Sequence, residues 1–163
     1  MKVQDRVSEI RGVIYSYCND IIDQSASSTF EVNRSEKRPD YGTISVEIRC
    51  FDGSLLKFFE KINRGIIEIY SYEYIRLNTG FFYHYQNEGV ENGIKKPLHH
   101  LHVGIKKDAN EKLLELLPNE LIEHGGPHYK VSEISFNEFM AMIIVNFFDG
   151  HRNFDNMLKN LGF

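Results

Sequence analysis

The chain has 163 residues, enough for one domain with a substantial core, and its 42% hydrophobic and 26% charged residues are ordinary for a globular protein. A formal net charge of −4 excludes a general attraction to nucleic acid or to an anionic membrane, so any such attraction needs a local basic patch. The two cysteines, Cys18 and Cys50, form no CxxC pair, which excludes a zinc ribbon or a CxxC redox motif. With no apolar leader and no apolar run near the ~20 residues of a membrane span, the sequence predicts a cytoplasmic protein without a membrane partner.

The first segment predicts a helix over about residues 1–25. Its apolar side chains recur at alternating steps of four and three, as on one stripe of an amphipathic helix: Val3, Val7, Ile10, Ile14, Tyr17 and Ile21. Two interpretations fit this stripe. It packs on the protein's own sheet, or it forms a seam with a partner, for example in a homodimer through the N-terminal helix.

The middle of the chain predicts an antiparallel β-meander over residues 42–106, after a polar loop with at most a short strand at 29–32. In "TISVEIRC" apolar and polar residues alternate, and Asp52-Gly53 then suits a tight hairpin turn. Four further runs with short turns between them complete five strands: "SLLKFFEKI", "IIEIYSYEYIRL", "FFYHYQN" and "PLHHLHVGI".

The last part, residues 110–163, predicts helices. Asn110 can cap "EKLLELL", Ser135 and Glu138 have capping-box spacing before an apolar helix that extends to about residue 148, and "FDNMLKNL" suits a short final helix. The order of elements predicts a single α+β domain over residues 1–163: an N-terminal helix, a five-stranded antiparallel sheet, and C-terminal helices packed on one face.

The stretch "PLHHLHVG" holds three of the seven histidines. On a strand, His100 and His102 point to one face about 6–7 Å apart, and His99 points to the other. His84, on the preceding strand, is the obvious third member of a three-histidine metal site. The same arrangement also suits metal-free acid–base chemistry, such as RNA cleavage by attack of the ribose 2′-OH.

Four lysines and no acid lie between Ile94 and Lys107, and such a cationic rim favours an anion over a divalent cation. We therefore expect no metal and no cofactor. The candidate catalytic residues are His84, His100, His102 and Tyr85. The candidate phosphate- or RNA-binding residues are Lys95, Lys96, Lys106, His99, Arg76 and Tyr83. The tyrosines of the two aromatic strands, Tyr72, Tyr74, Tyr83 and Tyr85, would give a sheet face that stacks on bases.

A plainer interpretation remains open, in which the histidines are half-exposed strand residues and the lysines protect an edge strand from aggregation. The loop histidines beside glycine or proline are expected to be structural or solvated: His124, His128 and His151.

Tyr83-His84-Tyr85, followed by Pro97-Leu98-His99-His100-Leu101-His102-Val103, resembles the TumE-like toxin family over about residues 55–105. The resemblance implies the toxin of a type II toxin–antitoxin pair that acts on RNA or translation, with a cognate antitoxin expected to be a helix-turn-helix protein. The family usually carries a further histidine segment between these two elements, and this chain has Glu88–Lys96 there instead.

The leading hypothesis is a toxin-like, metal-independent ribonuclease that uses histidine acid–base chemistry. The alternative is a non-enzymatic interaction module or a degenerate family member, and a metal-dependent hydrolase comes third.

Overall fold

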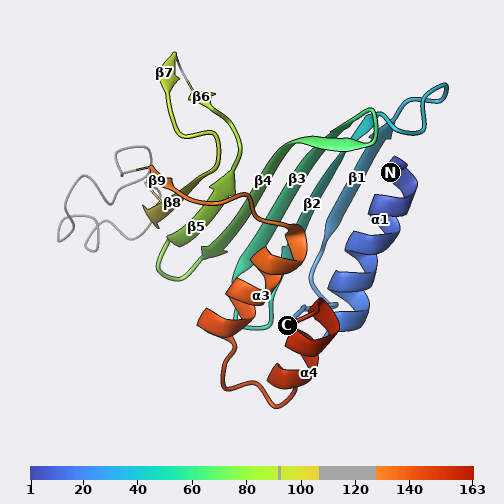
Figure 1. Ribbon diagram of the computed structural model, residues 1–163. Helices are drawn as coiled ribbons and strands as arrows, with labels where there is room; N and C mark the ends of the chain where they lie inside the picture. The colour runs from blue at the N-terminus through green and yellow to red at the C-terminus, as the bar shows by residue number, and fades with distance from the viewer. Residues whose placement is uncertain (92, 107–127) are drawn as a thin grey trace.

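The structure is a computed structural model that describes residues 1–91, 93–106 and 128–163 (Figure 1). Its main sheet is antiparallel throughout, with strand order β1-β2-β3-β4-β5-β8-β9. Its strands are β1 (Thr29–Arg34), β2 (Gly42–Arg49), β3 (Leu55–Asn63), β4 (Ile66–Arg76), β5 (Phe81–Gln86), β8 (His100–Ile105) and β9 (Tyr129–Lys130). A separate two-stranded hairpin joins β6 (Val90–Glu91) to β7 (Ile94–Lys95).

The meander is confirmed, but the prediction of five strands is wrong, because the described part of the chain forms seven strands in this sheet. The two added strands lie at its edges. β1 has a polar sequence in which only Phe30 and Val32 pack against the core, so its periodicity is weak. β9 has two residues and pairs with β8 across Tyr129 and Lys130, a length too short to give any sequence pattern.

The N-terminal helix is shorter than predicted. α1 (Val3–Gly12) continues into a short π-helix, η1 (Val13–Tyr17). At its end the Cys18 amide donates to the Val13 carbonyl at 2.9 Å. The chain then turns, and Ile22 forms an isolated bridge with Cys50 of the sheet. Most of the predicted apolar stripe is buried in the protein's own core, as the first of its two interpretations predicts: Val3, Val7, Ile10, Ile14 and Ile21 are buried, whereas Tyr17 is 40% exposed.

Two C-terminal helices follow, α3 (Phe136–Phe147) and α4 (Phe154–Leu161). The capping box is confirmed, since the Glu138 amide donates to Ser135 Oγ at 3.2 Å and the Ser135 amide donates to the Glu138 carboxylate at 2.7 Å. The helix predicted for "EKLLELL" lies outside the described residues.

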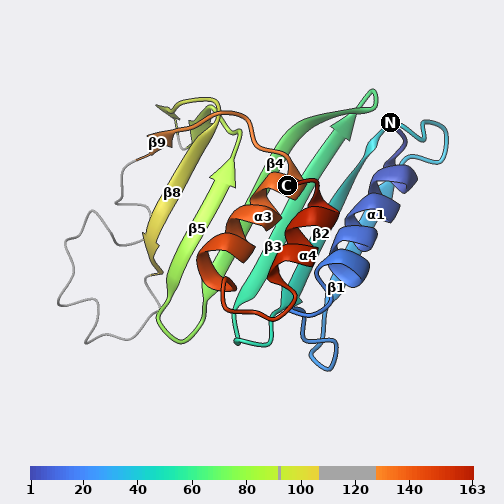
Figure 2. The same ribbon diagram turned by 60° about the horizontal axis from the view of Figure 1, so that its bottom comes forward.

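All the helices that the structure describes lie on the same face of the sheet, as predicted (Figure 2). Beneath them, Phe58 and Tyr72 of the sheet pack against Phe136 and Phe139 of α3. We call this the covered face and the opposite one the open face. None of the described helices is long and apolar enough to cross a membrane.

The covered face also buries an ion pair. Arg6 of α1 donates to both carboxylate oxygens of Glu60 on β3, at 2.8 and 2.6 Å, and the Tyr72 hydroxyl donates to the same carboxylate at 2.7 Å. Burial alone would lower the pKa of Arg6, but the hydrogen bonds and charge of Glu60 outweigh it, so that pKa is raised. This pair therefore fixes the helix to the sheet in one register.

Candidate functional site

The register of the last strands brings three of the predicted histidines, His84, His100 and His102, to the open face. In the antiparallel ladder His84 pairs with His102, and Gln86 pairs with His100. Residues directly opposite each other on neighbouring antiparallel strands share one face of the sheet. On the next strand Lys130 is opposite His100, so it lies on the same face.

A group of four polar side chains forms at this edge, which we call the histidine cluster: Gln86, His100, His102 and His128. One ring nitrogen from each of the three histidines lies within 4.8 Å of the others. The ring centroids are 4.9 Å apart for His100 and His102, 5.3 Å for His100 and His128, and 4.2 Å for His102 and His128. The cluster is largely withdrawn from water, because His100 is 0% exposed and His102 and Gln86 are each 8% exposed.

Hydrogen bonds fix the state of the His100 ring. Its Nδ1 lies 2.8 Å from the Pro97 carbonyl oxygen, which can only accept, so Nδ1 carries the proton. In a neutral ring Nε2 then has the lone pair, and it accepts from the Gln86 amide nitrogen at 3.0 Å. The same amide nitrogen lies 3.1 Å from His102 Nε2, so one side-chain amide joins both rings.

Burial keeps these rings neutral. Desolvation, helped by the neighbouring histidines, lowers the pKa of His102 to about 3. Desolvation also lowers the pKa of His100, and the charge of Lys96 lowers it further. The hydrogen bond to the Pro97 carbonyl raises this pKa but offsets the lowering only in part. Neutral imidazoles can accept a proton or bind a metal, but they have no extra proton to donate.

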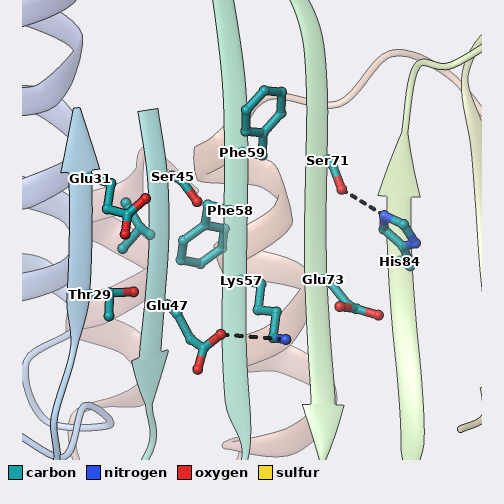
Figure 3. Close-up of a pocket in the computed structure, with 11 residues that line it drawn as sticks. Thr29, Glu31, Ser45, Glu47, Lys57, Phe58, Phe59, Ser71, Glu73 and His84 are labelled. Atoms are coloured by element: carbon teal, nitrogen blue, oxygen red, sulfur yellow. Dashed lines mark hydrogen bonds and ion pairs between the residues drawn. The ribbon is translucent and has the colours of Figure 1, made fainter. Parts of the chain in front are cut away.

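His84 stands next to this cluster without belonging to it. Its Nε2 lies 2.7 Å from Ser71 Oγ, and its ring stacks on that of His102 at 5.6 Å. It closes one end of a shallow hollow of about 300 Å³ that runs over the open face from β1 to β5 (Figure 3). Three carboxylates line this hollow: Glu31, Glu47 and Glu73. The hollow is therefore a poor place for an anion.

The predicted phosphate-binding lysines lie in different surroundings. Lys106 forms an ion pair with Glu73 at 2.5 Å and passes over the Phe82 ring at 4.6 Å. Lys96 is half-buried and close enough to lower the pKa of His100 and His102 through its charge, whereas Lys95 is exposed on the hairpin. Lys130, which sequence reasoning did not single out, adds an exposed cation opposite His100.

Four other predicted residues lie on the covered side and away from the histidine cluster. His99 Nδ1 is 3.0 Å from the Tyr70 hydroxyl, and the Tyr85 ring lies 6.1 Å from that of Phe139 in α3. Tyr83 and Arg76 both contact Phe147 at the end of α3, at 5.8 and 5.6 Å. The candidate RNA-binding and catalytic residues are thus divided between two faces.

The prediction that a tyrosine face is available for base stacking is wrong for its two central members. Tyr72 and Tyr74 are 1% and 0% exposed, because α3 covers them. Alternation along the strand gives the shared face of the tyrosines, but it does not say that the helices occupy that face.

His128 is the histidine of the cluster that the sequence did not place there, since it was expected to be a structural or solvated loop residue. It comes just before β9 and joins His100 and His102 only because β9 adds to the sheet beside β8. His124 lies outside the described residues. His151 accepts from the Asn153 amide at 3.3 Å in the turn before α4, which agrees with the structural role predicted for it.

A family model described as Toxin TumE matches residues 19–124 of the chain. The matched range includes β1 to β8 and therefore three histidines of the open face: His84, His100 and His102. No curated protein and no solved structure matches the chain.

Proposed function

Because the chain belongs to the TumE toxin family, we propose that it is the toxin of a toxin–antitoxin pair and that it cleaves RNA at the histidines of its open face. The observation that carries this proposal is the register of β5 and β8, which gathers His84, His100 and His102 on the side of the sheet that the described helices leave uncovered. Buried, chemically versatile side chains in such a group are typical of functional sites.

The surrounding charges indicate where an RNA backbone would lie. Phosphates are bound by lysine ammonium groups and repelled by carboxylates. Lys96 is close enough to His100 to act on it through its charge, and Lys130 of β9 lies opposite His100, whereas three glutamates line the hollow on the other side. The substrate is therefore expected over β8 and β9 and not along the hollow.

Metal-free acid–base catalysis, the mechanism predicted from the sequence, asks His100 and His102 to transfer protons. At pH 7 a ring with a pKa of about 3 is neutral, so His102 cannot act as the general acid. A ring with so low a pKa is also a weak proton acceptor, so its lone pair suits a metal ligand better than proton transfer. Metal independence of the reaction stays a prediction.

The test is cleavage of a defined RNA by purified, untagged protein, with and without EDTA. We expect cleavage by the wild-type chain and a loss of at least about 100-fold in His102→Ala, which is the size of a typical acid–base contribution. His151→Ala, a histidine far from the open face, serves as the matched control. Undiminished cleavage by folded His102→Ala would remove the assignment, and EDTA separates the metal-free from the metal-dependent reaction.

The antitoxin, expected to be a helix-turn-helix protein, is part of the same proposal. Neither α1, predicted as a possible partner seam, nor α3 offers an exposed apolar stripe, because Val3, Val7 and Ile10 of α1 and most apolar residues of α3 are buried. A homodimer or an antitoxin complex through these helices would have to use their exposed positions, such as Tyr17 or Val145. Light scattering of the free chain and co-purification with the product of the neighbouring gene test these two partners.

A further inference from the structure

We infer that His100, His102 and His128 form a binding site for one divalent transition-metal ion, with zinc as the best fit. The inference concerns binding, and it stands whether or not the chain cleaves RNA. It differs from the metal site considered from the sequence, because the third ligand is His128 of the β9 edge and not His84.

The geometry of the three rings suits a metal. Their ligand nitrogens lie within 4.8 Å of one another. Zinc–nitrogen bonds of about 2.0–2.1 Å place tetrahedral ligands about 3.3 Å apart, so small rotations of the side chains close the site. Two ligands come from alternate positions of β8, whose backbone the sheet holds in place. The third, His128, comes from the segment that leads into β9, the strand paired with β8.

The hydrogen bonds of His100 are those of a metal ligand. Metal-binding histidines almost always donate their second ring N–H to a carboxylate, a carbonyl or water, which fixes the ring and its tautomer. His100 Nδ1 donates to the Pro97 carbonyl at 2.8 Å and leaves the Nε2 lone pair for a metal. This bond is present in the described structure and needs no rearrangement when an ion binds.

The Gln86 amide indicates where the ion would bind. Its nitrogen lies 3.0 and 3.1 Å from the Nε2 atoms of His100 and His102, and an NH₂ group can donate one proton to each. Two lone pairs thus converge on one electropositive group. A cation between the two rings would satisfy both, with the Gln86 side chain moved aside.

His84 is excluded from the ligand set by its own contacts. Its Nε2 bonds to Ser71 Oγ at 2.7 Å, and its ring stacks nearly parallel to that of His102, at 26° between the planes. Stacked rings do not direct their nitrogens to a shared point. His84 therefore provides a control within the same face.

Two of the three neighbouring lysines, Lys106 and Lys130, do little to repel a cation, whereas the charge of Lys96 reaches His100 and His102 and works against one. Lys106 is paired with Glu73, so its charge is offset on the open face. Lys130 is exposed, and water screens its charge. Three imidazole nitrogen ligands favour zinc or its transition-metal neighbours over magnesium and calcium, which prefer oxygen ligands.

The experiment is a titration of the full, untagged chain, stripped with EDTA and dialysed, with Zn²⁺ in the presence of a competing chelator and with Co²⁺ followed by visible absorption. We expect one ion per chain, an intense Co²⁺ spectrum typical of four-coordinate sites, and a Tm that rises with added Zn²⁺. Removing a residue that hydrogen-bonds to a metal ligand typically lowers metal affinity about 10–100-fold. Removing a ligand itself, in His100→Ala, His102→Ala or His128→Ala, should therefore lower the affinity by more than about 100-fold.

The controls are His84→Ala and His99→Ala, which should keep one ion with affinity within about tenfold of the wild type. His128 is only half-buried, so His128→Ala removes a ligand at the smallest packing cost, and its circular dichroism and metal-free Tm show whether it folds. Weak binding of several ions with no Co²⁺ spectrum, or equal losses in His84→Ala and His128→Ala, would overturn the inference. Because no RNA is used, these outcomes are independent of the ribonuclease proposal.

Discussion

The two faces of one sheet handle their polar groups in different ways. On the covered face, Arg6, Glu60 and Tyr72 form a closed set of charge and hydrogen bonds under α1 and α3. On the open face, two imidazole lone pairs meet at a single amide, and a third histidine packs beside them. The first arrangement is complete as it stands, whereas the second has the capacity to bind something further.

This difference separates buried polarity that specifies structure from buried polarity available for chemistry. A buried ion pair restricts α1 to one position on the sheet, and its carboxylate has no role left for a substrate. Neutral histidines cost less to bury than charges do, so a buried cluster of them can keep its lone pairs available for a ligand. Single substitutions on either face test this contrast, and the largest effect on stability is expected on the covered face.

Arg6→Ala should have the largest effect on folding. It leaves the Glu60 carboxylate buried without its charge partner, and breaking a buried pair in this way costs about 3–5 kcal/mol of unfolding free energy. Urea unfolding followed by circular dichroism measures it. Arg11→Ala, which removes an exposed arginine of the same helix that stacks on Phe30, should cost less than about 1 kcal/mol. Equal losses in the two variants would show that the pair does not hold the helix.

His102→Ala should lower the free energy of unfolding less than Arg6→Ala does, but it should lower RNA cleavage more. It removes a hydrogen bond to Gln86 and part of a packed ring, which corresponds to about 1–3 kcal/mol. Urea unfolding and RNA cleavage are measured on the same preparation. If the loss of cleavage is no larger than the fraction of protein that is unfolded, the histidines of the open face have a structural role, like the polar groups of the covered face.

Ser135→Ala should have a moderate and local effect. It removes the acceptor for the Glu138 amide at the start of α3, and the loss of such a cap costs about 1 kcal/mol. Ser8→Ala in α1 is the matched control, because the Ser8 hydroxyl donates to the Gln4 carbonyl at an exposed position. It should lower the free energy of unfolding by about 0.5 kcal/mol or less. RNA cleavage should remain unchanged in both, and a selective loss in Ser135→Ala would connect α3 to the site.

The thiols of the covered side should be unreactive in the native protein. Burial raises the pKa of Cys18 and of Cys50 to about 12 each. At pH 8 both groups are then protonated, and only the thiolate attacks disulfide reagents. We expect labelling by such a reagent to be slow at pH 8 and complete on unfolding in urea. Rapid labelling of the native chain would show that the core beneath η1 opens readily.

The sequence predicts those features that depend on local periodicity. Alternation along β2 and β8 gives the strands and the separation of His99 from His100 and His102, and the Ser135–Glu138 spacing gives the start of α3. These patterns depend on residues within a few positions of one another, so a single sequence contains them.

The features that the sequence does not predict depend on pairing between distant segments. Arg6 lies among the polar residues of an amphipathic helix, and only the position of Glu60, 54 residues further on, explains its burial. His128 joins His100 because a two-residue strand pairs with β8. Tyr72 is unavailable for base stacking because the helices cover its face of the sheet. Periodicity alone does not predict which of the two faces the helices cover.

The most direct test of the account is growth of a bacterial host that expresses the chain without its antitoxin, at matched levels of folded protein. The account predicts growth arrest by the wild-type chain and by His151→Ala, and normal growth with His102→Ala. Arrest by His102→Ala equal to that of the wild type would contradict the claim that the histidines of the open face are the functional site of this toxin.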